Sequence, residues 1–483
     1  MPKVDTPHSQ HAAMAERWQR CRDAAIGLDA VREQKGTYLP MLSGQDDTEY
    51  KAYLKRADFY GALPRSIQGH RGSVFRKPPK IEVPAAIEDW LEDVTLTGIG
   101  LEGLLADAFD ELLEVGRYGL FVDMGVKKDG QEQRPYLVLT AAENVVSWRT
   151  TSQGGAQVLD RVVLREVVEE DDLEDEFILN EVEQYRVLAI AEGVFTHTLY
   201  RRAADDKDGD WEIHDVITPD TRGKPFDSIP FWFGNSGDMT PDVDKPPLME
   251  VADLCLSMWR NSADLENGFH YVGIPTPWVA GFPVGTSLRI GSNTAWVSDK
   301  TDAKADMLEF SGQGLKGLSE HIDGKKSDCA VFGSRLLEEQ KKTAETAETV
   351  RLRHAGETAS LMSMAAVVDA TFTAALEFAT MWAGQSGDVL VELNRDLLAV
   401  KATPQELQAL TAAVQAGLMS FETYYYNLEQ LELTRPAVDA EEESGEIDND
   451  GDKAVVNHFA QGRPADEAEE QKAEGLAEQV VAA

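Results

Sequence analysis

The chain has 483 residues and a formal net charge of −39, because 85 Asp and Glu residues outnumber 46 Lys and Arg residues. A chain this acidic is not expected to coat duplex DNA or to bind an anionic membrane, since both depend on cations that meet phosphate groups. Its length allows about two to four domains with a sizeable core, and the N-terminus lacks the apolar stretch of a secretion signal. Cys21, Cys255 and Cys329 lie far apart in the sequence without CxxC spacing, which predicts buried thiols in a reducing compartment rather than disulfides or zinc ligands.

The first quarter of the chain is expected to be helical. Helix-like patterns cover residues 10–35, 45–77 and 84–115, with a Gly- and Pro-containing break at 36–44 and a stop at Gly116. From there to about residue 240, short runs rich in β-branched and aromatic residues predict a series of strands separated by turns.

Two segments are unusually acidic. Residues 166–176 hold eight acids in eleven positions, which is typical of a solvated loop. Residues 439–452 hold another eight, and the tail that begins there is predicted to be disordered, with a short helix near 465–480.

A one-sided helix is predicted at residues 248–268, directly after Pro246 and Pro247. At 1.5 Å per residue it would be roughly 30 Å long. Charged and polar residues occupy its other side. This favours a helix that is repeated in several copies around a water-filled space over a helix in an enzyme core, although an ordinary amphipathic helix has the same pattern. The residues expected to pack are spaced at i, i+3, i+4 and i+7, and they are Leu248, Val251, Leu254, Cys255, Met258 and Trp259.

Short strands are expected from there to about residue 310, then helix from 314 to about 384, a strand at 390–394 and helices at 404–433. The apolar run 361–383 contains Asp369 and Glu377, so it is predicted to be a helix packed within the protein rather than a membrane span.

The search for catalytic or binding motifs is almost wholly negative. Residues 98–103 read GxGxxG, but a polar, helix-like segment precedes them where a dinucleotide site needs a buried strand, so a helix entry is the favoured interpretation. The acidic triplets at 206–210 and 448–452 lack the Gly and the Glu of a calcium-binding loop. P-loop, HExxH and GxSxG motifs are absent from the sequence, and no catalytic, cofactor-binding or metal-binding residue is predicted.

Several blocks of sequence resemble the portal proteins of tailed bacteriophages, in particular the phage portal group catalogued as DUF4055. They are spread between about residues 16 and 435, and each is modestly specific by itself. The blocks are WQRCRDAAIGLDAVREQKGTYLP, LLEVGRYGLFVD, AENVVSW, IPFWFG, PPLMEVADLCLSMWRNSADLENGFHYVGIPTPWVAG, CAVFGSRLL, TAETAETVR and TPQELQALTAAVQAGLMSFETYYYNL.

The resemblance implies an α+β fold with an α/β wing, two long stem helices, a small β-containing clip and a helical C-terminal crown. Mapped on this chain, the parts are the N-terminal helical part of the wing (1–115), the β-rich wing domain (116–245), the first stem helix (246–271), the clip (272–312), the second stem helix (313–330), the tunnel loop (331–342), a long kinked helix with the return to the wing (343–400), the crown helices (401–438) and an acidic, disordered tail (439–483).

The same resemblance implies a ring, usually a dodecamer, at one capsid vertex, which serves DNA packaging and ejection. The implied partners are further copies of the chain, weakly contacted double-stranded DNA, the terminase large subunit, a head-to-tail adaptor, the major capsid protein and a scaffold protein, but no membrane. The implied location is the portal vertex of the virion, and the host cytoplasm during assembly. No cofactor and no enzymatic activity are implied.

Physical arguments agree with this function and leave alternatives open. An acidic channel would keep DNA mobile, since each cation–phosphate contact deepens a salt-dependent well. Lys341 and Lys342, near the expected tunnel loop, are candidates for weak phosphate contacts or else a solvated pair at a helix start. Trp278 and Trp296 are candidates for partner docking, although Trp278 would also suit packing between neighbouring clips. The other hypotheses are an acidic structural or assembly protein of a virion without an axial channel and, third, a nucleotide-dependent enzyme.

Overall fold

The computed structural model describes the chain except residues 1–2, 126–132, 172–176, 204–208, 274–275, 283–284, 286–287, 290–294, 309–311, 335–346, 396, 398–403, 432, 436–437, 439 and 450–483. Helices and strands occupy separate stretches, which confirms the expected α+β class. The chain forms two compact units, Met1–Arg395 and Asp396–Ala483.

The N-terminal helical region is correctly predicted in kind but is more broken than expected. Gly27, at φ 105°, ends the first helix and separates it from the second, and the stretch predicted at 84–115 starts as a 3-10 helix and becomes α-helical only at Leu101. Gly116 ends it in the left-handed conformation, as the sequence indicates. The elements are α1 (Ser9–Ile26), α2 (Leu28–Glu33), η1 (Lys35–Thr37), α3 (Asp47–Arg56), α4 (Ala62–Val74), β1 (Lys80–Glu82), η2 (Ala85–Glu92) and α5 (Leu101–Val115).

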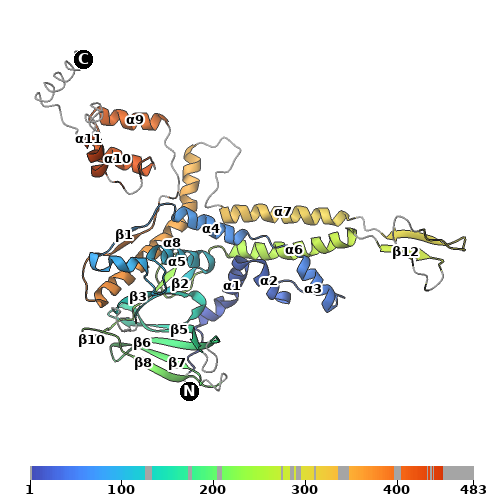
Figure 1. Ribbon diagram of the computed structural model, residues 1–483, viewed down its shortest axis with the longest axis horizontal. Helices are drawn as coiled ribbons and strands as arrows, with labels where there is room; N and C mark the ends of the chain where they lie inside the picture. Colours follow the sequence, from blue (N-terminus) through green and yellow to red (C-terminus); the bar gives the residue numbers. More distant parts are fainter. Residues whose placement is uncertain are drawn as a thin grey trace, which may run out of the picture. The chain divides into compact units, whose positions relative to one another are not determined.

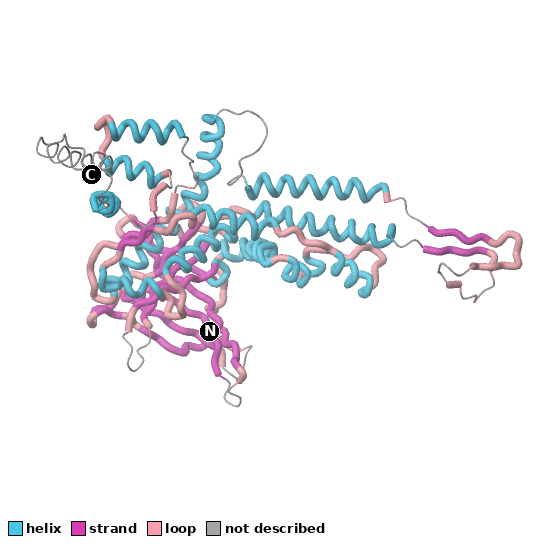
Figure 2. The backbone as a smooth tube through the Cα atoms, turned by 45° about the horizontal axis from the view of Figure 1, so that its top comes forward, coloured by secondary structure: helices cyan, strands magenta, loops and turns pink. Residues whose placement is uncertain are grey.

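Two antiparallel sheets follow (Figures 1 and 2). A three-stranded sheet has the order β11-β2-β3, and a five-stranded meander has the order β4-β5-β6-β7-β8. Two short pairs, β9–β10 and β1–β14, accompany these sheets. The bounds are β2 (Arg117–Met124), β3 (Pro135–Ala141), η3 (Ala142–Asn144), β4 (Val145–Gln153), β5 (Ala156–Asp171), β6 (Leu179–Ala191), β7 (Val194–Arg201), β8 (Glu212–Ile217), β9 (Asp220–Thr221), β10 (Lys224–Pro225), β11 (Phe231–Asn235) and β14 (Leu390–Glu392).

The core of the first unit surrounds β2. This strand is buried at every position from Arg117 to Asp123, because α5 and α8 contact it and the five-stranded sheet lies nearby. α8 (Ala347–Trp382) supplies apolar side chains to this core. Among the residues described, its segment Ala359–Trp382 is the one helical stretch apolar and long enough to cross a membrane, but about half of that stretch (56%) is buried inside the protein. Its Asp369 accepts a hydrogen bond from Leu393 N and pairs with Arg395 at 2.9 Å, so the stretch is a core helix, as the sequence predicts.

The prediction of a solvated loop at residues 166–176 is wrong for residues 166–171. Residues 166–171 continue β5 and pair with β6, for example Glu166 with Gln184. Cross-strand cations compensate the acids, because Arg186 donates to Glu166 at 2.6 Å and Arg201 donates to Glu170 at 2.6 Å. Residues 172–176 lie outside the described part of the chain.

A helical hairpin is formed by α6 (Met249–Gly273) and α7 (Gln313–Ser334), which lie side by side in both views (Figures 1 and 2). Two antiparallel strands, β12 (Thr276–Ala280) and β13 (Lys304–Leu308), connect their far ends. The expected boundaries need correction: α6 starts at Met249 and runs into the predicted clip, and α7 continues to Ser334, so residues 331–334 of the predicted tunnel loop are helical.

The second unit is described by itself. It contains α9 (Pro404–Gln415), α10 (Phe421–Gln430) and α11 (Ala440–Asn449). The Ser420 hydroxyl accepts a hydrogen bond from Thr423 N and so caps α10. The prediction of disorder from residue 439 is wrong for 440–449, which are helical; the predicted helix near 465–480 lies outside the described residues.

Candidate functional site: the helical hairpin and its strand tip

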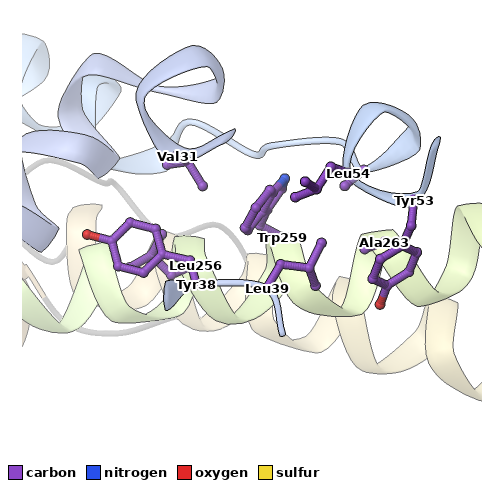
Figure 3. Close-up of a cluster of buried hydrophobic side chains, with 9 residues drawn as sticks. Val31, Tyr38, Leu39, Tyr53, Leu54, Leu256, Trp259 and Ala263 are labelled. Atoms are coloured by element: carbon purple, nitrogen blue, oxygen red, sulfur yellow. The ribbon is translucent and has the colours of Figure 1, made fainter. Parts of the chain in front are cut away.

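The base of the hairpin is held by an apolar cluster between α6 and the N-terminal helices (Figure 3). Trp259 is the largest side chain in it and is fully buried. Its indole Nε1 has no hydrogen-bond partner within the part of the chain that the structure describes, so apolar contact alone holds the ring. Its neighbours in the cluster come from α6, from α2 and α3, and from the chain that joins or follows these two helices. They are Val31, Tyr38, Leu39, Tyr53, Leu54, Ala57, Leu256 and Ala263.

The side of α6 that the sequence assigns to packing is largely inside the protein. Leu248, just before α6, is buried together with Val251, Cys255, Met258 and Trp259 of the helix, whereas Leu254 is only half-buried. Three further residues of the helix, Ala252, Leu256 and Ala263, are also buried. Helix α6 therefore packs over a wider arc than the periodicity predicts, because the N-terminal helices cover a second side of it.

The polar side of α6 does not simply line a wet space. Asp253 pairs with Arg20 of α1 at 2.9 Å, and Asp264 accepts a hydrogen bond from the hydroxyl of Tyr53. On the α7 side, the ammonium of Lys325 donates to Ser257 Oγ at 2.7 Å. Several polar groups that the sequence suggests are free thus hold α6 to neighbouring helices of the same chain.

Arg117 fixes the segment that leads into α6. Its Nη1 donates to the carbonyl oxygens of Pro241 and Asp242 at 2.8 and 2.9 Å. Its guanidinium lies 4.4 Å from the ring centroid of Trp148 and 4.1 Å from that of Phe233. Burial lowers the pKa of Arg117 to about 9. The sequence gives no signal for this contact, because it depends on strands β2, β4 and β11 meeting.

The strand tip carries large exposed side chains. In β12, Trp278 lies opposite Asp306 of β13, and 43% of its surface is exposed. Trp296 belongs to the segment that joins the two strands along the chain, and it donates its indole N–H to the carbonyl of Arg289 at 2.8 Å. All five residues of β13 are exposed, including Met307 and Leu308. The structure thus brings both tryptophans to one tip, where their role in docking stays a prediction.

The two lysines predicted to meet DNA cannot be placed, because Lys341 and Lys342 lie outside the described residues. Their proposed phosphate contact stays a prediction.

Residues 98–103 do not have the setting of a nucleotide site. The 3-10 helix η2 precedes them, not a strand. The backbone N–H of Gly98, which a phosphate would need, already donates to Asp93 Oδ1 at 2.9 Å. Within the described residues, no group of three or more His, Cys, Asp or Glu side chains is placed to hold a metal ion.

A buried ionic cluster joins the two sheets, and sequence reasoning missed it. Arg186 of β6 pairs with Asp123 of β2 at 3.1 Å and with Glu166 of β5 at 2.6 Å. The same guanidinium lies 3.1 Å from His197 Nδ1. Burial lowers the pKa of His197, which keeps the imidazole neutral beside a guanidinium. Both carboxylates pair with the same guanidinium, and each accepts a further hydrogen bond, Glu166 from Gln184 and Asp123 from Tyr136, so the cluster has the composition of a structural link.

A second cluster joins α1 to α5 and η3. Arg22 pairs with Glu111 at 2.7 Å, with Glu143 at 2.9 Å and with Glu114 at 3.1 Å. Three carboxylates surround one guanidinium, so the ionised cluster would carry two negative charges in excess. Burial raises the pKa of Glu114 to about 7.

Comparisons with known proteins find solved structures that match most of the chain and one family that matches residues 247–383. A search of curated proteins finds no match. Among solved structures, the chain is similar to one from the virion of a native gene transfer agent particle, with 12% identity, 83% of this chain and 98% of the other covered, and a TM-score of 0.39. It is also similar to one from the neck of the empty particle, with 13% identity, coverage of 81% and 95%, and a TM-score of 0.39. The family described as "Domain of unknown function (DUF4055)" matches residues 247–383, which run from the start of the hairpin through α8. The resemblance to DUF4055 is therefore confirmed for this segment.

Proposed function

We propose that this chain is a portal-type subunit that assembles into a closed ring at one vertex of a phage or phage-like capsid. Duplex DNA passes through the axial opening, and the strand tip of the hairpin docks the packaging motor and later the tail connector. Lys341 and Lys342 meet phosphates only weakly in this proposal, and no enzymatic step is involved.

The observation that carries the proposal is the build of the hairpin. At 1.5 Å per residue, the 25 residues of α6 span about 37 Å and lead to a two-stranded sheet. An isolated two-stranded sheet is marginally stable in water, and here its second strand is exposed along its whole length. Neighbouring copies in a ring would cover such strands, whereas a monomer would expose them as sites of aggregation.

The charge of the chain supports the same function. A net charge of −39 disfavours a permanent grip on phosphate, which suits a conduit that DNA must slide through. The same charge makes the subunits repel one another, so salt should favour assembly by shortening the screening length to about 10 Å at 0.1 M.

Light scattering and negative-stain imaging of the purified protein test the proposal. The expected result is a closed ring with a central opening, with a larger assembled fraction at higher salt. Monomers at every salt concentration would contradict it. Closed or open assemblies without an axial opening would instead support the alternative of an acidic structural or assembly protein of the virion.

A further inference from the structure

Two cysteines that are 74 positions apart in the sequence meet across the hairpin. Lys325 of α7 contacts Ser257 and Asn261 of α6, and Leu315 packs beside Gly268, so the helices run antiparallel in a fixed register. One turn beyond Lys325, this register brings Cys329 to Cys255. Both side chains are buried, at 2% and 0% exposure, both are free thiols, and they are hydrogen-bonded to each other.

The two thiols differ in their surroundings. Cys255 of α6 faces the start of α4, where the backbone amides of Leu63 and Ala62 favour its thiolate. The hydrogen bond from Cys329, and then these amides, lower the pKa of Cys255 to about 7. The hydrogen bond to Cys255, and then burial, raise the pKa of Cys329. Cys255 is therefore the nucleophile of the pair, and Cys329 keeps its proton.

The third cysteine provides an internal control. Cys21 is also fully buried, but burial, and then the carboxylates of Asp253 and Glu114, raise its pKa to about 12. A buried thiol of this kind is expected to be inert.

We propose that Cys255 and Cys329 are a redox-sensitive pair that hydrogen peroxide converts into a disulfide between α6 and α7. The Cys255 thiolate attacks one peroxide oxygen, the O–O bond breaks, and a sulfenic acid and hydroxide form; the hydroxide takes up the proton that Cys255 released and becomes water. The Cys329 sulfur then attacks the Cys255 sulfur, the S–O bond breaks, and the hydroxyl group leaves as water with the Cys329 proton. Two thiols are thus oxidised by two electrons, and one peroxide is reduced to two water molecules.

The cross-link would join the two helices near their root and close a loop that contains β12 and β13. It would restrain sliding of α7 along α6, a motion that packing and the contacts of Lys325 already oppose. If the proposed function holds, the pair would be reduced during assembly in the host and exposed to oxidation in released particles. The chemistry itself does not depend on the ring.

The test uses the full-length chain, purified in the reduced state and treated with hydrogen peroxide. Remaining thiols are alkylated under denaturing conditions, and the peptides are analysed by mass spectrometry without reduction. The expected product is a peptide pair linked through Cys255 and Cys329, released by reductant, with Cys21 alkylated. Non-reducing electrophoresis should keep the oxidised chain at monomer size, because the bond lies within one chain. A dimer-sized band, a link through Cys21 or no reaction would overturn the proposal.

Two variants separate the steps. In Cys329→Ser, which keeps a hydrogen-bond donor, the sulfenic acid at Cys255 should persist and be trapped by dimedone. The rate should rise with pH to a plateau below about pH 8, because the remaining contacts keep the pKa of Cys255 under the ordinary thiol value of about 8.5. In Cys255→Ser, neither dimedone adduct nor cross-link should form. Cys21→Ser should behave as the unchanged chain. Dimedone labelling that keeps rising beyond pH 8, or labelling of Cys329 in the Cys255→Ser variant, would contradict the assigned roles. Since every readout is made on the single chain, a failure here is distinct from a failure to form rings.

Discussion

Replacing Trp259 by alanine tests how the hairpin is held to the rest of the protein. The side chain is fully buried between α6 and the N-terminal helices. A tryptophan buries about 150–250 Å², and at about 25 cal/mol per Å² this corresponds to roughly 4–6 kcal/mol. Truncation of a buried Trp to Ala costs about 3–5 kcal/mol in practice. Because the indole N–H has no partner among the residues described, this cost contains no hydrogen-bond contribution.

The loss should be local to the root of the hairpin. Helix α3 contributes Tyr53 and Leu54 to the cluster, so its amides should report the change. A loss of about 3 kcal/mol corresponds to a protection factor that falls by about a hundredfold. Hydrogen exchange followed by mass spectrometry measures this in α3 and α6. Strand β6 lies outside the cluster, and its protection should be unchanged.

Trp259→Phe is the matched control. It keeps most of the ring contact and removes an N–H group that is buried without a partner, a group whose burial costs about 1–3 kcal/mol. We therefore expect α3 to stay protected to within about threefold of the original chain. If Trp259→Ala also left α3 within about threefold, the cluster would not be what holds the hairpin, and the argument from burial would be wrong.

Three further predictions concern charge and docking. Since burial raises the folded-state pKa of Glu114 to about 7, the folded chain binds more protons than the unfolded chain between about pH 4.5 and 7, and this group makes stability fall as pH rises through that window. Glu114→Gln leaves Arg22 with two carboxylates and should remove that slope, which is worth at most about 3 kcal/mol in denaturant titrations. An unchanged slope would assign the titration to another group. Trp278→Ala should leave the proposed ring intact in negative-stain images. It should weaken binding of the motor or adaptor by roughly 1–3 kcal/mol in pull-down titrations. A broken ring would instead assign the side chain to packing between clips. Changing both Lys341 and Lys342 to Ala should leave the ring intact but reduce DNA packaged per particle, and unchanged packaging would return them to a solvated pair.

Much of the fold follows from patterns that act over short distances. The i, i+3, i+4 spacing around Val251 and Met258 predicts α6 because one side of that helix is buried against its own chain. The stop at Gly116 is visible for a similar reason, since only a residue free to adopt positive φ suits that cap. Such signals need no knowledge of distant partners.

The failures come from contacts that only the folded chain supplies. Residues 166–171 look like a solvated loop because their charges dominate any local window, but Arg186 of β6 pairs with Glu166 and Arg201 of β7 pairs with Glu170. In the candidate site, the sequence predicts the aromatic side chains of the tip. It does not predict that the side chains on both faces of β13 are exposed to solvent. The meeting of Cys255 with Cys329 was missed because the register of two helices, and not the spacing of the cysteines, brings them together.

The anchoring of α6 has a mechanical consequence. Arg117 ties down the chain at Pro241 and Asp242, a few residues before a helix about 37 Å long. A rigid rod of that length amplifies angular error: a tilt of about 5° at its base displaces its far end by about 3 Å, comparable to the length of a hydrogen bond. The position of the tip is therefore set far from the tip, in the packing at the base of α6, to which Arg117 contributes. Sequence changes near Arg117 could thus re-aim the tip without altering a residue of it.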